Sequence, residues 1–271
     1  MPELPEVETT RRGILPHLQY KTVQKVIVRQ PKLRWPISDQ LPEALTQQPI
    51  ISVDRRGKYL LIHFPNGTLI IHLGMSGSLR ICRYDQSAEK HDHFEIVLDN
   101  GTSLRLRDPR RFGAVLWTEE PVEKHSLLIN LGPEPFDPLF NGLFLFERAK
   151  GRKLPIKTLI MDGKIVTGVG NIYASEALFL AGIHPKRAAG KISLERLQRL
   201  AEAIVEILQR AIEKGGTTLR DFVNETGKPG YFQQQLAVYG RAGQPCQKCT
   251  AAIKKIILGQ RSTFYCPNCQ H

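Results

Sequence analysis

Long hydrophobic runs are missing from this sequence of 271 residues. No stretch approaches the ~20 consecutive apolar residues that a helix needs to cross a bilayer. The first residues also lack the basic start and apolar run of a secretory signal, and the chain has no internal repeats or low-complexity tracts. These absences predict a globular protein of the cytoplasm, without a membrane-spanning segment and without export.

Acidic residues are scarce relative to basic ones. The chain has 38 Lys and Arg against 26 Asp and Glu, which gives a formal net charge of +12. Such an excess attracts polyanions, among which nucleic acid is the commonest partner. Charge alone is equally compatible with a merely basic protein. The hydrophobic fraction of 41% is enough for one large or two ordinary domains.

Cysteines are also few, and four of the five lie close to the C-terminus. Cys82 stands alone, and we interpret it as a small core residue instead of a nucleophile. The others form two C-x2-C pairs, namely Cys246, Cys249, Cys266 and Cys269. This spacing is typical of a zinc ribbon. Two disulfides are the alternative, which is unexpected in a chain without an export signal. We therefore predict one structural Zn²⁺ bound by these four thiolates.

Strand signals dominate roughly the first 115 residues. Two apolar runs flank Asn66-Gly67, and two more flank Asn100-Gly101. Asn-Gly between apolar runs is the strongest short signal for a β-hairpin. Two such hairpins indicate a β-sandwich.

Helical patterns follow a segment rich in acids and prolines at 118–138, which we interpret as a linker. One helix is predicted over 171–180. A longer one should begin after Ser193 and end at Gly215-Gly216. Its apolar face is predicted to comprise Leu194, Leu197, Ala201, Ile204, Val205, Leu208 and Ile212.

The fold class expected from these patterns is α+β, in three parts. Residues 1–131 form an N-terminal β-sandwich with a helix at its start. Residues 132–236 form a helical domain, and residues 237–271 form a four-cysteine zinc ribbon.

The opening Pro2-Glu3-Leu4-Pro5-Glu6 is unusually rigid and acidic for a chain terminus. If the initiator Met is removed, Pro2 presents a secondary amine, and an α-amino group has a pKa of about 8. Part of it is neutral near pH 7 and is able to form a Schiff base. Pro5 suits the first turn of a helix, Glu3 lies beside the amine, and Glu6 can orient either. An ordinary helix start with a favourable charge pattern is an equally good interpretation of these residues.

Several short stretches, in this order, resemble the bacterial formamidopyrimidine-DNA glycosylases. They include the opening PELPEVE, then HLGMSGSLR, KHDH, DPRRFGA, GVGNIYASEALF, GKPGYF and RSTFYCPNCQ. The resemblance covers essentially the whole chain. It implies the helix–two-turns–helix element in the helical domain. It also implies excision of oxidised purines, such as 8-oxoguanine and formamidopyrimidines, from double-stranded DNA. Strand cleavage by β,δ-elimination would follow, through a Schiff base on Pro2.

The resemblance assigns catalytic roles to four residues. Pro2 would attack the anomeric carbon of the sugar, and Glu3 would be the general acid that opens the ring. Lys58 would bind phosphate or stabilise developing negative charge, and Arg261 would contribute to δ-elimination. A solvated lysine and a solvated hairpin arginine are the alternatives for the last two. Two further carboxylates would support the site, Glu6 and Glu176.

Base flipping leaves a gap in the duplex, which inserted side chains can fill. The resemblance assigns this to Met75, Arg110 and Phe112. Burial in the core is the alternative for Met75 and Phe112. The DNA-binding residues that it implies are His91, Arg110, Arg152, Lys157 and Asn171. Lys153 is the alternative to Arg152, and a metal site at Lys90–His93 is the alternative for His91. The segment 217–231 resembles a loop that closes over the everted base.

Two other functions compete with this one. An endonuclease VIII-type enzyme for oxidised pyrimidines would share the domain order, but Leu4 and the Met75, Arg110 and Phe112 set favour the purine enzyme. A non-enzymatic zinc-ribbon DNA-binding protein would share the charge and the cysteines, but it leaves the opening segment unexplained. In each case we expect a monomer that binds double-stranded DNA.

Overall fold

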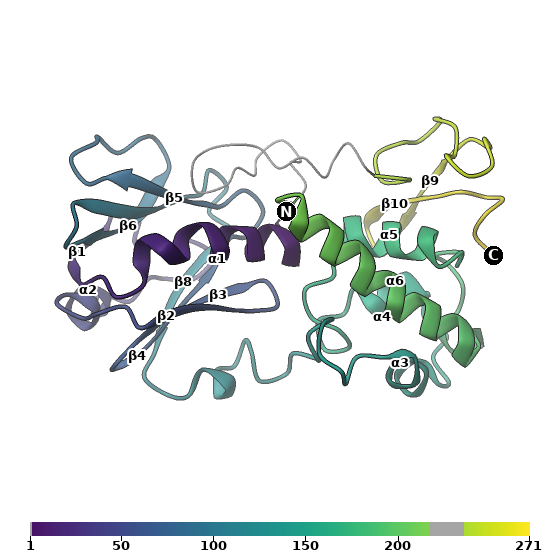
Figure 1. Ribbon diagram of the computed structural model, residues 1–271, viewed down its shortest axis with the longest axis horizontal. Coiled ribbons are helices and arrows are strands. Elements are labelled where there is room, and N and C mark those ends of the chain that lie inside the picture. The colour runs from purple at the N-terminus through teal and green to yellow at the C-terminus, as the bar shows by residue number, and fades with distance from the viewer. Residues whose placement is uncertain (1, 217–235) are drawn as a thin grey trace. The chain divides into compact units, whose positions relative to one another are not determined.

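The computed structural model describes residues 2–216 and 236–271 (Figure 1). Two compact units divide the described chain. One holds the residues up to Ile129 and again from Lys214 to Gly216, and the other holds Asn130–Glu213 and the described residues from 236 onward. The first unit is mainly strands and the second mainly helices, so the predicted α+β class is confirmed. The three-part division at 131 and 236 stays a prediction about domain boundaries.

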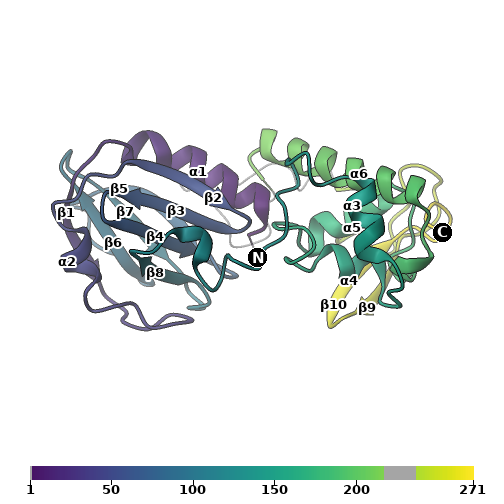
Figure 2. The same ribbon diagram turned by 90° about the horizontal axis from the view of Figure 1, so that it is seen from below.

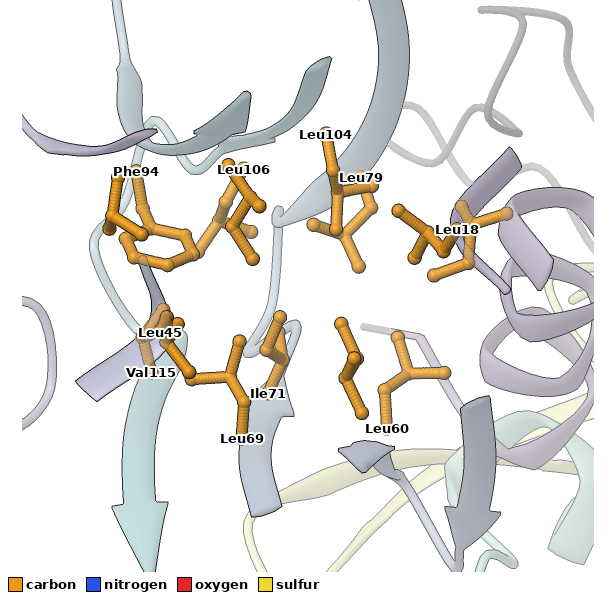
Figure 3. Close-up of a cluster of buried hydrophobic side chains, with 14 of the residues drawn as sticks. Leu18, Leu45, Leu60, Leu69, Ile71, Leu79, Phe94, Leu104, Leu106 and Val115 are labelled. Atoms are coloured by element: carbon orange, nitrogen blue, oxygen red, sulfur yellow. The ribbon is translucent and has the colours of Figure 1, made fainter. Parts of the chain in front are cut away.

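Two four-stranded antiparallel sheets form a sandwich in the first unit, with strand orders β1-β6-β7-β5 and β2-β3-β4-β8 (Figure 2). The strands are β1 (Val23–Val28), β2 (Ser52–Arg56), β3 (Tyr59–Phe64), β4 (Gly67–His72), β5 (Ser78–Arg83), β6 (Asp92–Leu98), β7 (Thr102–Arg107) and β8 (Ala114–Thr118). The two sheets enclose a core of mostly aliphatic side chains (Figure 3). Its labelled members include Leu60, Leu69, Ile71, Leu79, Leu104, Leu106 and Val115.

Helix α1 (Leu4–Leu18) packs against β2 and β5, which are edge strands of the two sheets. The helix thereby covers strand edges that would otherwise be open to pairing. Its buried Leu4, Val7, Ile14 and Leu18 supply the apolar side. The short helix α2 (Leu41–Leu45) packs against β1.

Both predicted hairpins are confirmed. Strands β3 and β4 pair from Phe64 and Gly67 outward, so their turn is Pro65-Asn66. Strands β6 and β7 are joined through Asn100 and Gly101, whose φ of +78° suits glycine. Asn100 also accepts a hydrogen bond from the backbone N–H of Thr102 at 3.2 Å. The second turn thus coincides with its Asn-Gly signal, whereas the first lies one residue before the Asn66-Gly67 pair, because Gly67 is already paired with Phe64.

The second unit is built around α5 (Asn171–Leu180) and α6 (Leu194–Glu213), which pack on each other. The remaining elements are η1 (Val122–Lys124) in the first unit, and α3 (Gly142–Ala149), α4 (Ile156–Ile160) and η2 (Ala189–Lys191) in the second. Helix α6 ends where predicted, because Gly215 and Gly216 both have positive φ. Its predicted apolar face is wrong at one point: Leu194, the first residue of the helix, is 44% exposed.

A two-stranded hairpin, β9 (Lys254–Leu258) and β10 (Arg261–Tyr265), completes the second unit. The predicted zinc-ribbon fold is confirmed, with Phe264, Ile253 and Val238 packed around Cys246 and Cys266.

One prediction on a cysteine fails. Cys82 lies in β5 and is only partly buried, so its interpretation as a core residue is wrong. No helix in the described ranges combines the length and the apolar character that crossing a bilayer requires.

Candidate active site and nucleic-acid interface

The start of α1 brings together Pro2, Glu3 and Glu6. Glu3 is the N-cap, and its side chain accepts from the backbone N–H of Glu6. The Glu6 carboxylate accepts from the backbone N–H of Glu3 at 2.8 Å, which completes a capping box. Both acids are only 2% exposed, and Pro2 is buried beside them. Pro5 lies in the first turn, as predicted. The helix start therefore holds two carboxylates next to the position of the candidate nucleophile.

Glu6 also contacts the residue at which α6 has just ended. A Cβ atom added to Gly216 would lie 3.1 Å from Glu6 Oε1 and 3.4 Å from its Cα. The positive φ of Gly216 and its missing side chain thus allow the backbone to approach the acid. The sequence indicated this glycine only as a helix stop.

Lys58 lies in a two-residue turn with Gly57, between β2 and β3. Arg55 donates to the carbonyl oxygen of Gly57 at 2.9 Å and to Glu8 Oε2 at 3.1 Å. Glu8 belongs to α1, so one carboxylate ties the helix of Pro2 to the turn of Lys58. Neither Glu8 nor Arg55 was singled out from the sequence, because their roles depend on a contact between distant segments.

Glu8 is held as a charged group. Burial favours its protonated form, but hydrogen bonds from Arg11 and Arg12 and the charges of Arg11 and Arg55 outweigh that effect. Together they lower the pKa of Glu8 from 4.5 to about 2. Arg11 and Arg12 bind Glu8 Oε1 at 2.9 and 2.8 Å. Glu8 is therefore an acceptor for three guanidinium groups and is unsuited to proton donation.

His72 is held neutral near the same turn. Burial, followed by the positive charges of Lys58 and Arg34, lowers its pKa from 6.5 to about 4. The backbone N–H of Gly74 donates to His72 Nδ1 at 3.0 Å, so that nitrogen carries no proton. A neutral imidazole here leaves its other nitrogen as a donor. His72 was not singled out from the sequence, although it stands three residues before Met75 in the HLGM stretch.

The three candidate void-filling residues occupy two neighbouring loops. Phe112 is 45% exposed, and the guanidinium of Arg110 lies 4.9 Å above its ring centroid. Met75 is partly buried on the other loop. Burial in the core, the alternative for Phe112, is therefore wrong. An exposed aromatic ring stacked by an arginine is instead suited to contact with a flat, anionic partner.

His91 precedes β6 directly and has a φ of +75°. Its ring lies 5.8 Å from that of His93, edge to face. The metal alternative at this position has no support in the described residues. Within them, groups of three or more metal-ligand side chains are limited to the four-cysteine cluster. Asp92 instead accepts a hydrogen bond from the backbone N–H of Glu89.

Asn171 opens α5 and connects three parts of the second unit. Its Oδ1 accepts from Lys157 Nζ at 2.6 Å, and its Nδ2 donates to the carbonyl oxygen of Ser262 at 3.0 Å and to Tyr239 Oη at 3.3 Å. The candidate DNA-binding asparagine is therefore fixed by both the helices and the zinc hairpin. Tyr239 was not singled out from the sequence.

Lys157 has a different setting from the one expected of a surface DNA contact. Its side chain is 1% exposed, and besides Asn171 it binds Thr263 Oγ1 at 2.7 Å. The structure gives it the position of a buried link between α4 and β10. Arg152 and Lys153 are both exposed, so either is available to a phosphate.

Glu176 in α5 is a buried carboxylate, only 2% exposed. Its carboxylate accepts from the backbone N–H groups of Ala237, Val238 and Tyr239 at 2.7, 3.0 and 2.8 Å. Burial raises its pKa, and these three donors oppose the rise. The side chain thus fixes the segment that leads into the zinc ribbon and carries Tyr239.

Arg261 is the exposed first residue of β10, directly after a turn in which Gly259 and Gln260 both have positive φ. A cavity of about 340 Å³ lies beside it, bounded by Lys157, Met161 and Leu258. The candidate catalytic arginine therefore stands at the tip of the hairpin. The predicted closing loop, 217–231, lies outside the described residues.

The four cysteines form a cluster suited to a metal. Their sulfur atoms all lie within 4.8 Å of one another. Cys249 and Cys266 are 3.4 Å apart at sulfur, and Cys246 and Cys269 are 3.9 Å apart. A disulfide needs about 2.05 Å, so the disulfide alternative is wrong. Four thiolates around zinc, each at about 2.3 Å, require sulfur separations near these values.

Comparison with known families assigns most of the chain. Residues 1–115 match the formamidopyrimidine-DNA glycosylase N-terminal domain, and residues 131–223 match the H2TH domain of the same glycosylase. Residues 243–271 match a zinc finger found in FPG and IleRS.

Individual relatives match over the full length. The formamidopyrimidine-DNA glycosylase of Methylococcus capsulatus is 59% identical over 270 residues, covering 100% of both chains. A Lactococcus lactis FPG mutant solved with DNA containing Fapy-dG is 34% identical, with a TM-score of 0.92 over 100% of both chains. MutM (FPG) from Thermus thermophilus is 39% identical, with a TM-score of 0.88 over 99% of this chain and 98% of that one.

Proposed function

The chain belongs to the formamidopyrimidine-DNA glycosylase family, and on that premise we propose that it excises oxidised purines from double-stranded DNA. It is then a DNA glycosylase that also cleaves the abasic site it creates. The observation that carries this proposal is the helix start, where Pro2 is buried beside two carboxylates that are each 2% exposed. The solved relative with Fapy-dG DNA supports the purine substrate.

The proposed chemistry begins at the nitrogen of Pro2, after loss of Met1. The neutral amine attacks the anomeric carbon, and the damaged base leaves with the electrons of the glycosidic bond and takes up the proton that the amine loses. Glu3 donates a proton to the ring oxygen as the sugar opens, which leaves an iminium between Pro2 and the sugar. Loss of a proton from the adjacent carbon then expels the 3′ phosphate. A second elimination expels the 5′ phosphate.

Each of the two units contributes its own group of proposed supporting residues. Glu6 fixes the backbone of Glu3, while Lys58 supplies a positive charge for phosphate or for the developing anion. In the other unit, Asn171, Arg152 and Arg261 are the proposed phosphate ligands. Lys157 acts on DNA through Asn171, because its own amine is buried. His91, Met75, Arg110 and Phe112 complete the proposed DNA contacts.

One Zn²⁺ is the proposed cofactor, with a structural role. Four cysteine ligands fill its coordination shell and leave no open position for substrate. The ion would fix the hairpin that carries Arg261 and the carbonyl of Ser262, which binds Asn171. We expect the protein to act as a monomer on chromosomal DNA in the cytoplasm.

Borohydride trapping tests the amine mechanism. Reduction during turnover of an 8-oxoguanine duplex should yield a stable cross-link that mass analysis locates on Pro2. An extra glycine ahead of Pro2 turns its nitrogen into an amide and should abolish trapping and strand cleavage, while DNA binding survives. Pro5→Ala, at the same helix start, is the matched control and should still trap. An adduct on an internal lysine would contradict the proposal.

Oxidised pyrimidines are a second candidate substrate class. The wild-type Lactococcus lactis enzyme has been solved with DNA that contains an oxidised pyrimidine. Excision rates of 8-oxoguanine and thymine glycol, measured in otherwise identical duplexes, decide between the two. We expect 8-oxoguanine to be excised faster, and a strong preference for thymine glycol would reverse the assignment.

A further inference from the structure

Asp108 is a fully buried carboxylate between the loop that carries Met75 and the loop that carries Arg110 and Phe112. No role was predicted for it from the sequence, and it takes no part in the proposed chemistry. Its Oδ1 accepts from Ser76 Oγ at 2.9 Å. Its Oδ2 accepts from the backbone N–H of Gly113 at 2.7 Å. Each oxygen of one side chain thus holds a different loop.

The same loops touch through their backbones. A Cβ atom on Gly74, whose φ is +64°, would lie 2.4 Å from the carbonyl carbon of Phe112. A Cβ atom on Gly113 would lie 2.8 Å from the carbonyl oxygen of His72. No side chain separates the loops at these points, so a shift of one is transmitted to the other.

A second hydrogen bond extends this link to Arg110. Ser76 Oγ accepts from the backbone N–H of Arg110 at 3.2 Å while it donates to Asp108. The hydroxyl is oriented by the carboxylate, because a carboxylate can only accept. The carbonyl oxygen of Asp108 is in turn 3.0 Å from His93 Nε2. One buried residue therefore connects the Met75 loop, the Arg110–Phe112 loop and β6.

We propose that Asp108 is a positioning residue that holds Met75, Arg110 and Phe112 together as a single wedge for extrusion of the damaged nucleotide. This inference rests on the proposed function. Extrusion requires side chains that enter the duplex at the moment when stacking is lost. Two loops that move independently would fill the gap only part of the time. Held by Asp108, the three side chains enter together.

The test compares Asp108→Asn and Ser76→Ala with Asp99→Asn. In Asp108→Asn an amide NH₂ faces one of the two donors, so one hydrogen bond is lost or reversed at nearly unchanged volume. Ser76→Ala removes the relay hydroxyl alone. Asp99 is a matched control, since it is exposed and its carboxylate also accepts from a backbone N–H, that of Thr22 at 3.1 Å.

Three readouts are measured on each purified full-length variant. They are single-turnover excision of 8-oxoguanine, cleavage of a preformed abasic site, and fluorescence of 2-aminopurine placed beside the lesion. Thermal unfolding is recorded alongside. For Asp108→Asn and Ser76→Ala we expect excision and the fluorescence change to slow by roughly tenfold to a hundredfold. Cleavage of the preformed abasic site, and Pro2 trapping on that same abasic duplex, should keep the rates of the wild type, because no stacked base has to be extruded.

Equal losses in excision and abasic-site cleavage would overturn the proposal, since they would mean that Asp108 only stabilises the sandwich. Unchanged excision in both variants would overturn it as well. If Asp108→Asn does not fold, Ser76→Ala decides the question. Failure of the proposed function has a different signature, because the wild-type protein would then not be trapped on DNA at all.

Discussion

Single residues near Pro2 show how the surroundings of a side chain decide its chemistry. Glu3 and Glu6 cap a helix with their carboxylates and bind backbone N–H groups. Glu8, two residues after Glu6, accepts from three guanidinium groups and has a pKa of about 2. Glu8 has therefore already lost its proton near neutral pH. The same helix therefore separates a candidate proton donor from a permanent anion.

His72 gives a prediction for the pH dependence of stability. Its pKa is about 4 in the folded protein, against an ordinary value of 6.5 for histidine. The unfolded chain therefore binds the proton first, and the free energy of unfolding falls as pH drops from 6.5 through 4. A shift of this size corresponds to on the order of 3 kcal/mol. Urea unfolding measured between pH 7 and 4 checks this.

Variants of His72 make that measurement specific. His72→Gln should have a flatter profile than the wild type over this range. His17→Gln, at an exposed position near the end of α1, should have the profile of the wild type. An identical fall in all three proteins would show that other groups cause the loss. The charged or titratable groups that act on His72 are Lys58, Arg34 and Asp108.

At the scale of elements, the zinc hairpin and the helices of the second unit are joined by buried polar contacts. Asn171 at the start of α5 binds the carbonyl oxygen of Ser262 in β10. Lys157 in α4 binds Thr263 in the same strand. Glu176 in α5 fixes residues 237–239 through three backbone hydrogen bonds. The hairpin therefore forms one connected structure with the helices that carry the proposed DNA contacts.

Removal of zinc should for this reason weaken DNA binding more than it disturbs the sandwich. Cys249→Ser or treatment with a chelator is expected to release one zinc per chain, because a structural zinc contributes folding energy to its module. DNA affinity, followed by fluorescence anisotropy, should fall at least tenfold. The far-UV signal of the sandwich strands should persist.

Cys82→Ser is the matched control, since Cys82 lies in β5, away from the cluster. This variant should keep its zinc and its affinity. Full DNA binding by a zinc-free protein would contradict the link from the hairpin to Asn171.

Local signals in the sequence were sufficient for several elements. The helix predicted over 171–180 is α5, and the Asn-Gly hairpins are β3–β4 and β6–β7. Each depends on neighbouring residues, such as a glycine that permits a turn. Lys157 shows the opposite case. It ends a basic run that reads as solvated, and its burial depends on Thr263, which lies 106 residues further along the chain. Asp108 and Glu8 were not predicted either, because their contacts also join segments that are distant in the sequence.

On the scale of the whole molecule, the formal charge of +12 governs association with DNA. Phosphate contacts release condensed counterions, so the logarithm of affinity should fall linearly and steeply with the logarithm of salt concentration. The slope of this line depends only on the positively charged side chains that contact phosphate groups. A salt titration therefore separates contacting residues from those that merely add to the total.

Arg152→Gln should reduce the slope of that salt titration by roughly one unit if Arg152 contacts a phosphate. Arg199→Gln removes an equal charge from the exposed face of α6 and should leave the slope nearly unchanged. If the slope changes for Lys153→Gln and not for Arg152→Gln, the phosphate contact is made by Lys153. A flat salt response of the wild type would contradict phosphate binding as the main source of affinity.

Gly74 and Gly113 set a limit on the mutational tolerance of this family member. Backbone atoms of Phe112 and His72 lie only 2.4 and 2.8 Å from the positions that a Cβ atom would take on Gly74 and Gly113. No side chain fits there. Even alanine, the mildest change, should therefore be purged from a library of random variants selected for repair in living cells. Arg111, exposed next to Phe112 in the same loop as Gly113, should accept small and polar replacements, while its φ of +55° disfavours β-branched residues and proline. The absence of a Cβ atom at Gly74 and Gly113 would then be under stronger selection than the charged side chain of Arg111.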